Sequence, residues 1–120
     1  MGMQQAVSTC FSKYVTFQGR AARSEYWWFT LFVLIVVTVL TIVAVVTELS
    51  ILGILIAIFE LAILLPSLSV TVRRLHDSDK SGWWFFIALV PVIGGLWLLY
   101  LLVVGGTPGP NRFGNPAQQA

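Results

Sequence analysis

Residues 51–72 read ILGILIAIFELAILLPSLSVTV, and only one charged side chain, Glu60, interrupts them. At a rise of 1.5 Å per residue, a helix of this length spans roughly 30 Å, the thickness of the hydrocarbon core of a bilayer. Two stretches of similar length, residues 27–46 and 83–104, contain no charged residue. The sequence therefore predicts an all-α integral membrane protein with three apolar segments.

The composition agrees with a membrane protein. Hydrophobic residues make up 58% of the 120 residues and charged residues only 10%, whereas a soluble domain carries about a quarter of its residues as charged side chains. We expect a single membrane domain over residues 1–120. The net charge of +2 is spread among apolar segments, so we expect contact with anionic lipid headgroups and no nucleic-acid partner.

The distribution of basic residues predicts the topology. The loop at 47–50 is short enough to make the first two segments a tight antiparallel hairpin. If the third segment also crosses, six Lys and Arg residues flank one side of the membrane and one flanks the other; they are Lys13, Arg20, Arg23, Arg73, Arg74 and Lys80 against Arg112. By the positive-inside rule, the amino terminus is then cytoplasmic and the carboxyl terminus lies outside.

The third segment, residues 83–104, leaves two interpretations open. It contains Pro91, Gly94 and Gly95 near its middle, and all three weaken a helix. It forms either one kinked span or a re-entrant hairpin, whose halves of about 12–14 Å reach only the middle of the membrane. Exposed backbone at such a tip must be covered by protein, and a chain this small has little to spare. We therefore favour the kinked span and a count of three transmembrane helices.

The two ends of the chain have different patterns. Residues 5–17 place Val7, Cys10, Phe11 and Tyr14 at helical spacing, which predicts a short amphipathic helix lying in the headgroup region. Residues 105–120 are rich in Gly, Pro, Asn and Gln and are predicted to form a flexible tail.

Three ordered motifs resemble those of a known family. They are FQGRAARSEYWW at residues 17–28, RRLHD at 73–77 followed by SGWW at 81–84, and GTPG at 106–109 followed by NRFG at 111–114. Together they resemble the signatures of the DUF805 family, over about residues 11–116. The resemblance implies a compact helical protein of the bacterial inner membrane, without an assigned activity or catalytic residues. Glu60 departs from the family's pattern.

Glu60 defines a candidate polar site at the membrane midplane. An ionised carboxylate there costs at least ~3 kcal/mol, so we expect a neutral acid. The two hairpin turns put it level with Thr38 and with the Gly94–Gly95 break. In the simpler interpretation, Glu60 is protonated and hydrogen-bonded to Thr38, Thr41 or a carbonyl of the broken helix. In the alternative, these residues form a site that responds to protons or cations.

A second candidate site is a headgroup or partner docking surface, comprising Arg20, Arg23, Arg73, Arg74, His76, Asp77 and Lys80. Each basic residue near an anionic surface contributes about 1 kcal/mol. Catalysis by His76 with Asp77 is disfavoured, because adjacent side chains rarely point the same way and no nucleophile stands nearby in the sequence. Asn111 and Arg112 form a third candidate in the tail. If they share a side with His76, the three-span count is wrong and a composite polar site follows.

These patterns favour a non-enzymatic function. One histidine and one cysteine do not suffice for an ordinary metal site, and no nucleotide or cofactor motif is present. We expect an accessory or scaffold component that docks lipid or protein, as a homo-oligomer or with another membrane protein. The alternative function is a small proton-coupled transporter or channel subunit that uses Glu60.

Overall fold

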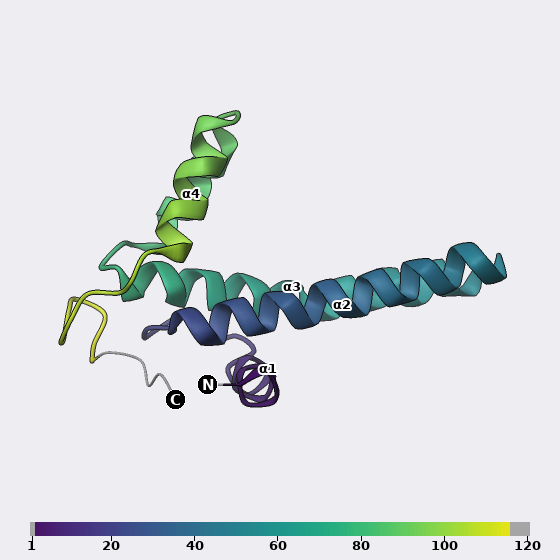
Figure 1. Cartoon of the computed structure of the whole chain (residues 1–120). Coiled ribbons are helices and arrows are strands. Elements are labelled where there is room, and N and C mark those ends of the chain that lie inside the picture. The colour runs from purple at the N-terminus through teal and green to yellow at the C-terminus, as the bar shows by residue number, and fades with distance from the viewer. Residues whose placement is uncertain (1, 116–120) are drawn as a thin grey trace.

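Two long helices dominate the computed structural model, which describes residues 2–115. They are α2 (Arg23–Thr47) and α3 (Ile51–Asp77), and they run antiparallel side by side (Figure 1). Both are long and apolar enough to cross a membrane. Glu48 ends α2 in a left-handed conformation, with φ 57°, and lets the chain turn at once into α3. The all-helical prediction and this hairpin are confirmed.

The outer half of this hairpin exposes its apolar side chains. Val45 is 72% exposed and Leu61 is 70% exposed. Such exposure is expected for apolar side chains that contact lipid rather than a protein core. The buried residues instead gather near the amino end of α2 and the carboxyl end of α3, a region that we call the base. Cys10, Phe29 and Val70 form one small core there.

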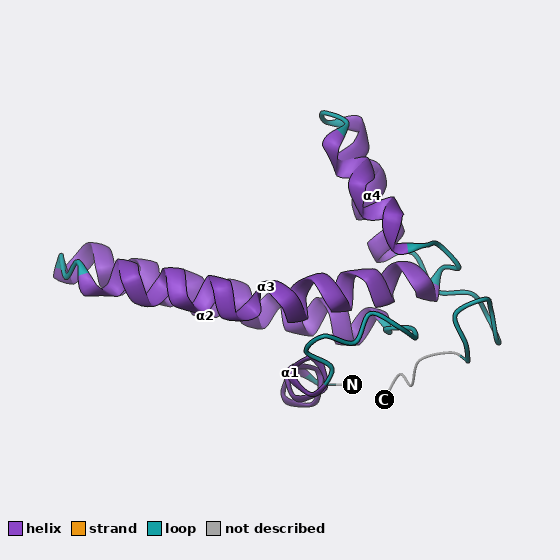
Figure 2. Ribbon diagram, turned by 180° about the vertical axis from the view of Figure 1, so that it is seen from behind, coloured by secondary structure: helices purple, strands orange, loops and turns teal. Residues whose placement is uncertain are grey.

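The first helix, α1 (Met3–Ser12), packs at the base against α2 and α3. Figure 2 shows it end-on beside the two long helices. The sequence predicts a helix over residues 5–17, whereas residues 13–17 form a turn and a loop. Ala6 and Cys10 are fully buried, so one face of the helix packs onto protein.

The third apolar segment is not one helix, which corrects the favoured interpretation of residues 83–104. It forms a 3₁₀ helix, η1 (Gly82–Leu89), and a short α-helix, α4 (Ile93–Val103), which pack against each other as a hairpin. Within residues 2–115, two helices are long enough to cross a membrane, and α4 is not among them. The chain leaves the base through η1 and returns to it through α4.

The local backbone explains why the segment reverses. Val92 has φ 62° and ψ −64°, and the amide of Ile93 donates to the carbonyl of Pro91 at 2.7 Å. These are the features of a classic γ-turn, which reverses the chain within three residues. Gly94 then lies so close to η1 that a Cβ atom there would be 1.8 Å from the Ile87 carbonyl oxygen. Glycine at 94 therefore permits the two halves to cover each other.

The tail also differs from its prediction. Residues 105–115 fold back onto the end of α3, where the Thr107 amide donates to the Asp77 carbonyl at 2.7 Å. Asn111 and Gly114 close a small loop by pairing their backbones. The rest of the predicted flexible tail, residues 116–120, lies outside the described residues. The carboxyl-terminal motif consequently shares the base with the motif at 73–77.

Candidate functional site

Asp77 lies at the centre of a buried polar cluster at the base. Its Oδ1 atom accepts from Nε of Arg20 at 2.9 Å, and its Oδ2 atom accepts from Nη1 of Arg74 at 2.7 Å. All three side chains are at least 95% shielded from solvent. One carboxylate thus lies between two guanidinium groups. Hydrogen bonds between such ionised partners are stronger than those between neutral groups.

The two arginines also bind backbone carbonyls from the returning chain. Arg20 donates to the carbonyls of Thr107 at 2.6 Å and Gly109 at 2.8 Å. Arg74 donates to the carbonyl of Leu102 at 3.0 Å and also to that of Val104. The carbonyls at the carboxyl end of a helix lack hydrogen-bond donors within that helix. The guanidinium of Arg74 donates to one of them at the end of α4.

Gly106 fits the same cluster because it has no side chain. A Cβ atom at this position would lie 1.9 Å from Oδ2 of Asp77. The carboxylate cannot move aside, since the two arginines hold it. A glycine at position 106, the first residue of the third motif, is therefore required for the tail to approach Asp77.

A separate buried ion pair joins Arg73 of α3 to Glu25 of α2. Nη1 of Arg73 is 2.5 Å from Oε2 of Glu25, and the two side chains are 0% and 3% exposed. The Cys10 thiol donates to the same carboxylate oxygen at 3.7 Å. Burial, together with the negative charge of Glu25, raises the pKa of the Cys10 thiol to about 12. Among the described residues, Nε and Nη2 of Arg73 have no hydrogen-bond partner.

The outer edge of the site holds His76 and the third motif. Nδ1 of His76 is 2.9 Å from the Gly19 carbonyl oxygen, and its ring stacks on Phe113 with a centroid distance of 3.9 Å. The side-chain Nδ2 of Asn111 donates to the His76 carbonyl at 3.0 Å. Arg112 pairs with Asp79 at 3.2 Å in a more exposed position. In the part of the chain that the structure describes, His76 and Asp77 have separate side-chain partners.

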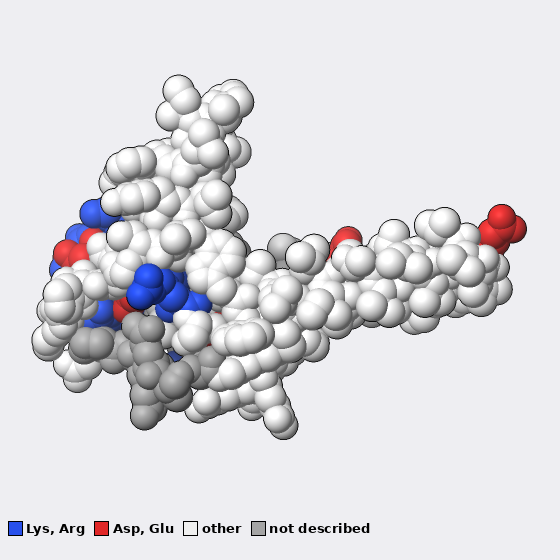
Figure 3. Space-filling view, viewed as in Figure 1, with Lys and Arg blue, Asp and Glu red and all other residues white. Residues whose placement is uncertain are grey.

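The predicted docking surface is therefore divided. Five of its seven residues are buried within the base, namely Arg20, Arg73, Arg74, His76 and Asp77. Arg23 is exposed and Lys80 is partly exposed, so these two remain accessible to a lipid or a partner. Figure 3 shows Lys and Arg gathered over the base, whereas the long outer hairpin carries only isolated acidic atoms.

The structure does not assemble the predicted midplane site within one chain. Glu60 and Thr38 are both exposed, and the Thr41 hydroxyl donates to the Val37 carbonyl of its own helix. Within residues 2–115, Glu60 makes no hydrogen bond or ion pair. Gly94 and Gly95 belong to the η1–α4 hairpin, which leaves the base in another direction from α3 (Figures 1 and 2).

Sequence reasoning missed Glu25, Gly106 and Thr107 as members of the site. A signal for Glu25 was present: Glu25 and Arg73 lie equally far along the chain from Leu49, in the turn of the first hairpin. An antiparallel hairpin about this turn brings the two to the same level. No comparable local signal exists for Gly106, because its partner Asp77 is reached only when the third segment reverses.

These features define a class: a small helical membrane protein whose charged residues bind one another at the base. The family described as "Protein of unknown function (DUF805)" matches residues 14–115, and the chain belongs to it. The chain is 42% identical over 104 residues to "Inner membrane protein YhaH" of Escherichia coli (strain K12), covering 84% of this chain and 86% of that protein.

Two further relatives are similar over most of their length. "Inner membrane protein YhaI" of the same strain is 45% identical over 102 residues, covering 85% of this chain and 86% of the relative. "Uncharacterized protein YiiR" is 28% identical over 129 residues, covering 86% of each. No solved structure matches the chain. The predicted family is confirmed, and the apolar helices agree with the membrane location that two of these names state.

Proposed function

We propose that this chain is a non-enzymatic accessory or scaffold protein of the bacterial inner membrane. One observation carries the proposal: all three family motifs converge on Asp77, and their polar groups bind one another. A catalytic centre keeps a reactive group open to a substrate. Here the Asp77 carboxylate and its two arginines are buried and bound to one another. This arrangement suits a role in holding the fold together better than a reactive site.

The same proposal includes a topology of two spans and one re-entrant hairpin. η1 has 8 residues and α4 has 11, so each is roughly 16 Å long and too short to cross the hydrocarbon core. With Arg112 bound to Asp79 at the base, all seven Lys and Arg residues belong to one side. By the positive-inside rule this side is cytoplasmic, and both termini lie there.

Reporter fusions test the topology. Green fluorescent protein joined after Ala120 should fluoresce, because it folds in the cytoplasm, and alkaline phosphatase at the same place should be inactive. Phosphatase inserted at residues 47–50 should be active outside the membrane. An active carboxyl-terminal phosphatase would restore the three-span count and overturn the proposed placement.

Charge reversal of accessible residues tests the scaffold role. Arg23→Glu and Lys80→Glu alter exposed cations without touching the buried ion pairs. We expect them to reduce the capture of membrane proteins cross-linked in intact cells, including a second copy of this chain. Glu60→Gln, the matched change in the apolar part of α3, should leave capture unchanged. Equal capture by all three variants would contradict the scaffold role.

Glu60 supports a second candidate, a small proton-coupled transporter or channel subunit. Its carboxyl is exposed on an apolar helix and unpaired among the described residues. A second copy packed over α3 would cover it, so this function requires a homo-oligomer. Reconstituted vesicles should then show a pH-dependent flux that Glu60→Gln abolishes; a flux that survives this change would exclude the candidate.

A further inference from the structure

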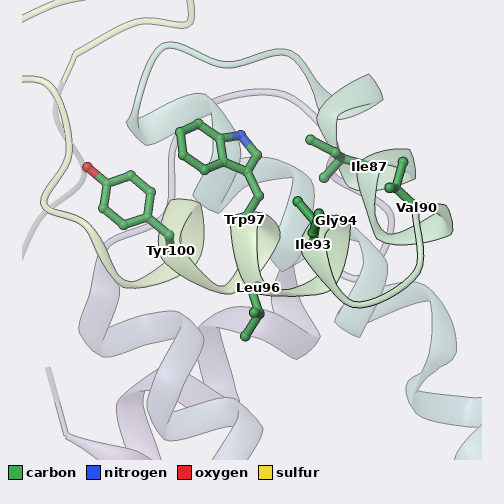
Figure 4. A pocket seen from close by; sticks show the side chains of 7 residues that line it. All are labelled: Ile87, Val90, Ile93, Gly94, Leu96, Trp97 and Tyr100. Carbon is green, nitrogen blue, oxygen red and sulfur yellow. The ribbon is translucent and has the colours of Figure 1, made fainter.

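One side of α4 lines two adjoining hollows that share Trp97 and Tyr100. The first has a volume of about 570 Å³ and lies between η1 and α4, against Ile87, Val90 and Gly94 (Figure 4). The second has a volume of about 500 Å³ and lies nearer the base, against Ser78, Lys80 and the backbone of 105–107. The two hollows therefore adjoin at these side chains, and together we call them the groove along α4.

The two parts of the groove differ in polarity. The first part is walled almost entirely by hydrocarbon and aromatic carbon. Trp97 and Tyr100 continue this wall, with their rings stacked at 5.3 Å. The second part is more polar, and Ser78, Lys80 and Thr107 are among its lining residues. Among the described residues, Lys80 makes no ion pair, so its charge is free to bind an anion.

We propose that this groove binds one anionic phospholipid from the surrounding membrane. Its phosphate lies beside Lys80, and one acyl chain follows α4 past Trp97 toward Gly94. This inference rests on the proposed membrane placement, in which the base, and with it the carboxyl end of α4 beside Lys80, lies at headgroup depth.

Three properties of the groove agree with this occupant. Eleven helical residues give the apolar wall a length of roughly 16 Å, enough for a large part of an acyl chain. Trp and Tyr prefer the boundary between headgroups and hydrocarbon, where Tyr100, one turn from the carboxyl end of α4, would lie. A basic side chain at an anionic membrane surface contributes about 1 kcal/mol, which favours an anionic lipid over a zwitterionic one.

Native mass spectrometry of the full chain in detergent tests the proposal by titration with dioleoyl phosphatidylglycerol and with dioleoyl phosphatidylcholine. We expect the wild type to prefer phosphatidylglycerol. Lys80→Gln should lower this affinity about fivefold, the equivalent of ~1 kcal/mol, and leave phosphatidylcholine unchanged. Lys13→Gln, a basic residue of the base that does not line the groove, is the matched control and should bind like the wild type. Trp97→Ala should weaken both lipids.

Several results would overturn the proposal. They are equal binding of the two lipids by the wild type, equal effects of Lys80→Gln and Lys13→Gln, or full competition by soluble glycerol phosphate, which would indicate a site for a free phosphate. Should Trp97→Ala unfold the chain, Lys80→Gln alone decides, since its side chain is partly exposed. The reporter fusions fail independently of these titrations, so an error in topology is distinguishable from an error in lipid binding.

Discussion

Removing one member of the Glu25–Arg73 ion pair should be far more harmful than removing both. Both side chains are almost completely buried, and Nε and Nη2 of Arg73 already lack partners among the described residues. Glu25→Leu would leave a buried guanidinium without its counter-charge, which typically costs about 3–5 kcal/mol. The double variant Glu25→Leu/Arg73→Met removes both charges. Because desolvation opposes buried ion pairs, this variant should recover most or all of the loss.

A double-mutant cycle measures the effect. The wild type, Glu25→Leu, Arg73→Met and the double variant would be unfolded in mixed micelles with increasing dodecyl sulfate. The loss of helix would be followed by circular dichroism. The exposed pair between Arg112 and Asp79, whose side chains are 61% and 41% exposed, supplies the control. Asp79→Asn should change the free energy of unfolding by less than about 1 kcal/mol, as exposed pairs do.

Two outcomes of this cycle would refute the argument. If Glu25→Leu costs no more than Asp79→Asn, the pair is not buried in the folded protein. If the double variant loses as much as the two single variants added together, Glu25 and Arg73 do not interact.

Three further predictions concern single positions at the base and in the second hairpin. Gly106→Ala should destabilise the docked tail by about 1–3 kcal/mol, because its methyl group meets the clamped Asp77 carboxylate; increased proteolysis of the tail measures this. Gly94→Ala should destabilise the chain by a similar amount through its contact with η1, as read by unfolding in micelles. Cys10 should react slowly with maleimide at pH 8, because a thiol whose pKa is raised to about 12 remains neutral and only the thiolate is nucleophilic.

Neighbouring residues provide the matched controls. A Cβ atom at Gly105 or Gly95 would meet nothing within 4 Å. Gly105→Ala should therefore leave tail proteolysis unchanged, and Gly95→Ala should stabilise α4 by up to about 1 kcal/mol. If either control behaves like its neighbour, the close approaches described above are wrong. Rapid labelling of Cys10 in the folded protein would show that its thiol is accessible and ionised.

The first hairpin could be predicted from sequence because its determinants are local. Residues 27–46 and 51–72 are long enough for a span and are separated by too few residues to permit anything except a turn. The third segment has the same length and composition. Its reversal depends on the γ-turn at Val92 and on the approach of Gly94 to Ile87, which no periodicity reveals. We also expected the tip to need a protein cover; within one chain it stays exposed, with Leu89 at 79% and Val92 at 76%.

The candidate site was predicted in part. The sequence indicated which polar residues matter, since Arg20, Arg74 and Asp77 stand in motifs between apolar segments. It did not indicate what they do, because basic residues are ordinarily exposed and we interpreted them as headgroup ligands. Their burial depends on carbonyls from residues 102–109, which reach the base only after the third segment has reversed. An error in one turn thus changed the interpretation of the whole site.

The bonds from Arg20 to Thr107 and Gly109 also impose an order on biosynthesis. A ribosome makes Arg20 early and its partners late, with both hairpins in between. During that interval Arg20 and Arg74 must rely on water or headgroups for these hydrogen bonds, which favours their staying at the membrane surface. The bonds of Arg20 to Thr107 and Gly109 form only after residue 109 has been made, so the base is the last part of the fold to be completed.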